Sequence, residues 1–191
     1  YKIDNHETGL LDPNGNRLST PVFGYGTSQA TASWPGPTLM AKSNVASNVQ
    51  WSNELVDATS GKPYGFPFTS LDGQSVVDTS IYWAFSIPGY EQYTIEQDGV
   101  PIVTHIHGGH SKVDVDGNPE HHFTNDYEIT GTEFRFKKYN YKNDQPAGTL
   151  WYHDHTIGTF KRYSSVLSPF RTPCLTNISM RILFCRKNCN R

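Results

Sequence analysis

Residues 150–155 read LWYHDH and residues 104–109 read THIHGG, so each stretch holds two histidines separated by one residue. Successive side chains of an extended strand point to opposite faces, which puts both imidazoles of a pair on one face, about 7 Å apart along the strand. If the two strands meet in one sheet or at one end of a sandwich, four imidazoles converge. Such a set suits copper, zinc, iron or nickel rather than calcium or magnesium. The sequence therefore predicts a transition-metal site built on strands.

Turn-forming residues recur along the first 158 residues, between short runs rich in β-branched and aromatic residues. Examples are DPNG at 12–15, WPGP at 34–37, DGNP at 116–119 and PAG at 146–148. The runs that we expect to form strands are residues 45–51, 81–87, 100–106, 133–141 and 149–155. Long helical periodicity is absent from the sequence. The pattern predicts an all-β fold, either a sandwich or a barrel.

The composition fits one folded domain. The chain has 191 residues, of which 36% are hydrophobic and 13% aromatic, enough for one buried core. The net charge of -2 comes without a basic stripe, which argues against a nucleic-acid partner. Because no apolar run reaches the roughly 20 residues of a membrane helix, we expect no membrane span. Tyr1 is followed by neither a charged leader nor an apolar signal core, which leaves the compartment open.

Residues 159–191 differ from the rest of the chain. They hold seven of the 16 lysines and arginines, no acidic residue, and all three cysteines, Cys174, Cys185 and Cys189. An odd number of cysteines cannot pair fully within one chain. We therefore expect a domain of residues 1–158 and a divergent, basic and poorly ordered tail of residues 159–191.

Four motifs together resemble one family. WPGPT at 34–38, THIHGG at 104–109, DGNPE at 116–120 and LWYHDH at 150–155 are similar, in order and spacing, to the first cupredoxin domain of a multicopper oxidase. Within this family, the motifs most resemble those of the spore-coat laccase and bilirubin oxidase group. The resemblance implies a cupredoxin-like Greek-key β-sandwich. After residue 158 the chain departs from the family, so we expect the sandwich to be incomplete at its C-terminal strand.

The resemblance also implies roles for single residues. In this family the first domain supplies half of the ligands of a trinuclear copper cluster. By motif position His105 would bind the type 2 copper, and His107, His153 and His155 would bind the type 3 pair. Asp116 falls where the family places an acidic residue near the oxygen channel, which implies proton delivery, although an Asp-Gly pair is also a turn signal.

The activity implied by the resemblance couples one-electron oxidation of a substrate to reduction of dioxygen to water. The partners would be dioxygen, a small reducing substrate and the missing cupredoxin domains, which complete the cluster. No cysteine of this chain has flanking histidines, so the chain lacks the Cys-ligated copper site through which electrons enter. We therefore expect the isolated chain to be inactive and not intensely blue.

Two alternatives stay open beside this reading. Three histidines and an open position can also form a zinc or iron site in a β-sandwich enzyme. The chain could instead be a non-enzymatic or aberrantly truncated copper-binding product. A cupin fits less well, since cupins usually add a Glu soon after His-x-His, where this chain has SKV at 111–113.

Side chains next to the candidate ligands are expected to support them. Asp154 lies between two of these histidines and faces away from a metal on an extended strand, so we expect a structural role. Trp151 and Tyr152 are expected to pack around the site rather than carry electrons. The histidines outside the motifs are expected in solvated loops; these are His6, His110, His121 and His122.

Overall fold

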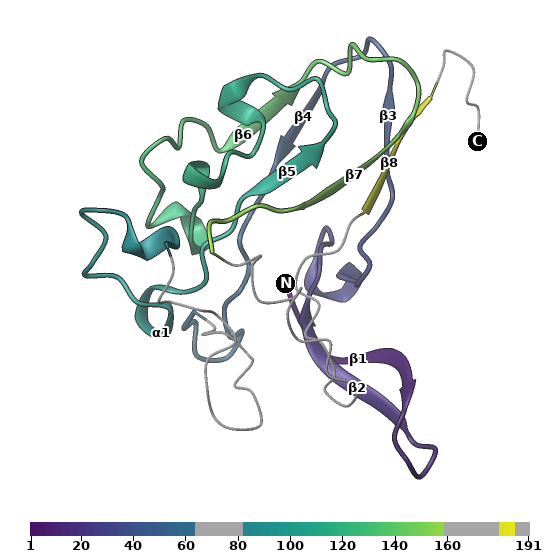
Figure 1. Ribbon diagram of the computed structural model, residues 1–191, viewed down its shortest axis with the longest axis vertical. Coiled ribbons are helices and arrows are strands. Elements are labelled where there is room, and N and C mark those ends of the chain that lie inside the picture. Colours follow the sequence, from purple (N-terminus) through teal and green to yellow (C-terminus); the bar gives the residue numbers. More distant parts are fainter. Residues whose placement is uncertain (64–81, 159–179, 186–191) are drawn as a thin grey trace.

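The computed structural model of the chain describes residues 1–63, 82–158 and 180–185 (Figure 1). Over these residues strands are the main regular elements, joined by turns and by one short α-helix, α1 (Ile95–Asp98). The predicted all-β class is confirmed. Among the described helices, none is long and apolar enough to cross a membrane.

The largest sheet has four strands and contains both His-x-His motifs. Its order is β3 (Leu39–Lys42), β8 (Met180–Cys185), β7 (Thr149–Asp154) and β5 (Thr104–His107). β7 is antiparallel to both of its neighbours, whereas β3 and β8 are parallel. Figure 1 shows β5 and β7 running side by side, which brings two motifs far apart in the sequence into contact.

A smaller sheet packs against this one through an aromatic core. Its strands, β4 (Ser47–Gln50) and β6 (Lys138–Tyr141), are antiparallel. Tyr139 and Tyr141 of β6 are buried together with Tyr152 of β7, in one cluster that also contains Ile106 and Val115. Two sheets that share a core are consistent with the predicted sandwich. The Greek-key connection stays a prediction.

A hairpin formed by β1 (Lys2–Leu11) and β2 (Arg17–Phe23) projects from the rest of the molecule (Figure 1). The DPNG turn closes it, as the sequence predicts for this motif. One carboxylate oxygen of Asp12 accepts the backbone N–H groups of Asn14 and Asn16, both at 2.8 Å. The Asp side chain thus replaces backbone partners that the turn cannot supply.

Three of the five expected strands contain an observed one, the run 100–106 overlaps β5 (Thr104–His107), and the described part of the fifth contains none. Residues 81–87 were expected to be extended, but Ala84–Ser86 forms a 3-10 turn. The hydroxyl of Ser86 accepts the backbone N–H of Trp83 at 2.8 Å and donates to its carbonyl at 2.9 Å. A side chain that bonds its neighbouring backbone in this way competes with strand pairing, which explains the difference.

β8 comes from the tail that the composition sets apart. It pairs with both β3 and β7, so Met180–Cys185 belongs to the sheet. The predicted incompleteness of the sandwich at its C-terminal strand is therefore not confirmed. The rest of the tail, with Cys174 and Cys189, lies outside the described residues, and the division at residue 158 stays a prediction.

Candidate metal centre

The register between β5 and β7 brings the two motifs together. His105 lies opposite His153, and His107 lies opposite Trp151. Because side chains alternate along each strand, these four side chains share one face of the sheet, and the residues between them face the core.

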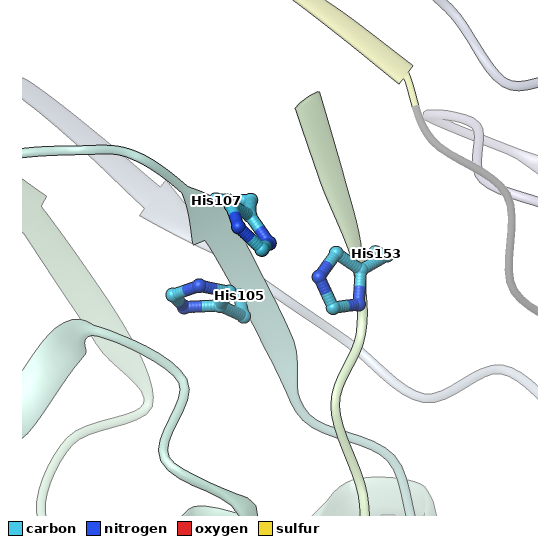
Figure 2. Close-up of side chains that lie close together, drawn as sticks. All are labelled: His105, His107 and His153. Atoms are coloured by element: carbon cyan, nitrogen blue, oxygen red, sulfur yellow. The ribbon is translucent and has the colours of Figure 1, made fainter. Parts of the chain in front are cut away.

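Three of the four candidate ligands form a group that could hold a metal ion. His105, His107 and His153 each offer one ring nitrogen, and these three atoms lie within 4.8 Å of one another. Figure 2 shows the three side chains close together, His105 and His107 on β5 and His153 on β7. His153 is buried, His105 is half-buried and His107 is exposed, so the group lies at the surface of the described structure.

The fourth candidate, His155, lies one residue beyond the end of β7. The centroid of its ring is 4.9 Å from that of His105 and 5.4 Å from that of His153. The structure thus gathers four imidazoles, although only three have ring nitrogens close enough to form the group described above.

Backbone carbonyls orient two of the rings. The Nδ1 atom of His105 lies 2.5 Å from the carbonyl oxygen of Asp116, and Nδ1 of His153 lies 2.7 Å from the carbonyl oxygen of Asp154. A carbonyl oxygen only accepts, so Nδ1 is the donor in both rings. In the neutral ring the lone pair is then on Nε2, the atom that remains for a metal.

Burial favours the neutral form of the ligands. Desolvation lowers the pKa of His153 to about 4 and also lowers the pKa of His155. The neighbouring histidines shift both pKa values in the same direction, because a second positive charge nearby is unfavourable. Neutral imidazole is the form that binds a metal, so the group is suited to a cation near neutral pH.

Asp116 lies beside His105, and its expected role in proton delivery stays a prediction. Oδ2 of Asp116 is 3.8 Å from Nδ1 of His105, and the Asp side chain is 41% exposed. The turn expected from the Asp-Gly pair is present as well, since Gly117 has a φ of +79°. Asp116 therefore contacts His105 through its backbone and also places a solvent-accessible carboxylate near the histidine group.

The aromatic residues next to the ligands pack as expected. The ring of Trp151 stacks on His107, with 4.5 Å between centroids, and on His153, with 4.3 Å. Tyr152 points to the other face of the sheet, where its hydroxyl donates to the carbonyl of Pro37 at 2.8 Å. Trp151 therefore covers two candidate ligands, whereas Tyr152 anchors the strand in the core.

The expectation for the remaining histidines is partly wrong. His121 is 3% exposed and His122 is fully buried, because the loop between β5 and β6 folds onto the apolar cluster around α1. The ring of His122 lies edge-on to Tyr90, with 5.9 Å between centroids. His6 lies in strand β1 rather than in a loop, and His110 is exposed as expected. Phe123, directly after His122, is a sequence signal that could have pointed to burial.

Comparison with known proteins identifies relatives, although no family model matches the chain. It is 37% identical over 139 residues to multicopper oxidase LPR1 homolog 5 of Oryza sativa subsp. japonica, which covers 73% of this chain and 18% of the relative. It is 33% identical over 168 residues to multicopper oxidase LPR2 of Arabidopsis thaliana, a match that covers 81% of this chain and 25% of the relative. It is 34% identical over 138 residues to a laccase of Bacillus subtilis, a match that covers 72% of this chain and 22% of the relative.

The chain thus spans about a fifth to a quarter of the length of the curated relatives that it matches. The matched proteins from two plants and a bacterium are all multicopper oxidases or laccases. This similarity, together with the histidine group on β5 and β7, shows that the chain belongs to the multicopper oxidase family.

Proposed function

We propose that this chain is the copper-binding first domain of a laccase-like multicopper oxidase. In this proposal His105 binds the type 2 copper of a trinuclear cluster, and His107, His153 and His155 bind the type 3 pair. The observation that carries the proposal is the group of three ring nitrogens within 4.8 Å of one another, on adjacent strands of a chain that belongs to this family.

The residues present fit copper. Imidazole is a favoured ligand of copper, and the described group consists of imidazoles alone. Carbonyl acceptors hold His105 and His153 in the orientation that leaves Nε2 for a metal. Desolvation, which keeps His153 neutral, also favours metal binding over protonation.

In the whole protein, copper would supply the one-electron chemistry that reduces dioxygen to water. The residues of this chain would hold the ions, and the exposed carboxylate of Asp116 would exchange protons between solvent and the site. The other half of the ligands, the electron-entry copper and the pocket for a small reducing substrate would lie in further cupredoxin domains. The isolated chain would therefore bind copper without oxidase activity.

Titration of the 191-residue chain with Cu²⁺ tests the proposal. We expect binding, and we expect His105→Ala, His107→Ala and His153→Ala each to weaken it by about 100-fold or more, since losing a ligand exceeds the effect of losing an outer partner. His110→Ala is the matched control, because His110 is exposed and lies outside the group. Calorimetry gives the affinity, and electron paramagnetic resonance shows whether nitrogen ligands surround the ion. Equal Cu²⁺ affinity in all four variants would refute the proposal.

A further inference from the structure

Asp154 stands between two candidate ligands, yet its side chain bonds to backbone and hydroxyl groups of the protein. Its Oδ1 atom accepts the backbone N–H of Val103 at 2.8 Å and the hydroxyl of Thr156 at 2.9 Å. Val103 directly precedes β5, and Thr156 lies two residues beyond β7. One carboxylate oxygen therefore links the residue before β5 to the segment that follows β7.

His155 depends on this junction more than the other candidate ligands do. Those three lie within strands that pair with each other, whereas His155 follows the end of β7. The backbone N–H of His155 donates to the carbonyl of Val103 at 2.8 Å. Val103 is thus bonded at both of its backbone groups, by the carboxylate of Asp154 and by the amide of His155.

Asp154 is half-buried, and the two residues that it bonds are shielded from water. Val103 is fully buried, and Thr156 is 2% exposed. Hydrogen bonds to an ionised carboxylate are stronger than neutral ones, and burial prevents water from replacing a lost acceptor. Removing the carboxylate would therefore leave the buried N–H of Val103 without this partner, and residues 154–156 would be free to shift relative to β5.

We propose that Asp154 is a positioning residue for the metal site. By bonding Val103 and Thr156, it holds the ring of His155 beside that of His105, where the centroids are 4.9 Å apart. The carboxylate does not touch the metal; it acts through the backbone that carries His155. The inference rests on the proposed function, because it takes His155 as a copper ligand.

A double-mutant cycle in the 191-residue chain tests this role, with Cu²⁺ affinity measured by competition with a chelator. We expect Asp154→Ala to weaken Cu²⁺ binding by about 10- to 100-fold, the range typical of outer partners of a ligand. In a His155→Ala background the same change should have no further effect, since the residue that it positions is gone. In a His107→Ala background it should keep its full effect, which makes this the matched control.

Two further variants separate positioning from folding. Asp154→Asn keeps an oxygen that accepts the N–H of Val103, so its affinity should stay within a few-fold of the original chain. Thr156→Val removes a hydroxyl but little volume, and should cause a smaller loss that again disappears in the His155→Ala background. Circular dichroism checks that each variant is folded. If Asp154→Ala does not fold, the double-mutant cycle is measured with Thr156→Val in its place.

The outcomes distinguish this inference from the proposed function. If the original chain binds Cu²⁺ through His105 but Asp154→Ala binds equally well, the positioning role is wrong and the copper site stands. An equal loss from Asp154→Ala with and without His155 would also overturn the role. If His105→Ala, His107→Ala and His153→Ala all bind Cu²⁺ as tightly as the His110→Ala control, the proposed function itself fails, and the inference fails with it.

Discussion

Gly117 occupies a position that no other residue fits without strain. Its φ of +79° lies in the left-handed region, and a Cβ built there would lie 2.3 Å from the carbonyl oxygen of Thr104 and 2.7 Å from Cα of His105. The turn that Gly117 closes therefore rests directly on the strand that carries the first two candidate ligands. The Asp-Gly pair predicted a turn, but not this contact, because the contact depends on how the loop folds back over β5.

Replacing Gly117 by Ala should lower the free energy of unfolding by about 3 kcal/mol, since it combines a backbone clash with left-handed strain. Urea unfolding followed by circular dichroism measures this loss. Gly148→Ala is the control, because a Cβ at Gly148 would meet no atom within 4 Å and its φ is not left-handed. That control should change stability by less than about 0.5 kcal/mol. Equal losses in the two variants would show that close approach is not the reason for the glycine.

At the scale of elements, strands at or near β5 and β7 were predictable because these parts of the sequence are rich in β-branched and aromatic residues. Strand periodicity alone places His105 and His107 on one face, and the structure shows the expected meeting with His153. The carbonyl contacts that orient these rings were not predictable; that of His105 comes from the loop backbone at Asp116, and that of His153 comes from Asp154, the next residue along β7. The binding of copper by these residues stays a prediction.

Other strands were missed because their pairing depends on distant partners. β3 (Leu39–Lys42) contains no β-branched or aromatic residue, and its place beside β8 overrides that weak propensity. β8 lies in a segment that charge and cysteine counts set apart from the domain. Charge and cysteine counts describe the segment as a whole and carry no information on strand pairing. They therefore could not show that six residues of this tail form a strand that pairs with β7.

Trp151 offers a spectroscopic test of the face that β5 and β7 share. Its ring stacks on His107 and His153, so Cu²⁺ bound there would quench its fluorescence strongly. We expect Trp151→Phe to remove the larger part of the Cu²⁺-induced loss of emission. Trp83→Phe is the control, since Trp83 packs on Phe85 in the other apolar cluster. Quenching that persists in Trp151→Phe and disappears in Trp83→Phe would place the metal elsewhere.

At the scale of the whole molecule, the loop between β5 and β6 makes folding sensitive to acid. It carries His122 into the apolar cluster around α1, where burial lowers the pKa of this residue to about 4. Burial lowers the pKa of His121 as well, against the opposing charges of Asp114 and Glu133. Both side chains are thus buried in the neutral form, and the molecule must release them before they can take up a proton.

The unfolded chain binds a proton at His122 more readily than the folded chain does. In the unfolded chain a histidine has a pKa of about 6.5. Above that pH His122 is neutral in both the folded and the unfolded state, so the free energy of unfolding does not depend on this residue. Between pH of about 6.5 and 4 the unfolded state gains protons first, and the free energy of unfolding falls as the pH drops. The shift at His122 corresponds to a loss of about 3 kcal/mol across this window.

Replacing His122 by Phe should remove this part of the pH dependence, because the new ring fills the space beside Tyr90 and does not titrate. Urea unfolding of both proteins, at a series of pH values, gives the difference in free energy. Carboxylates and the other histidines titrate in both chains, so the difference isolates His122. It should grow as the pH falls from about 6.5 toward 4. A difference that stays constant with pH would mean that His122 is not the group responsible.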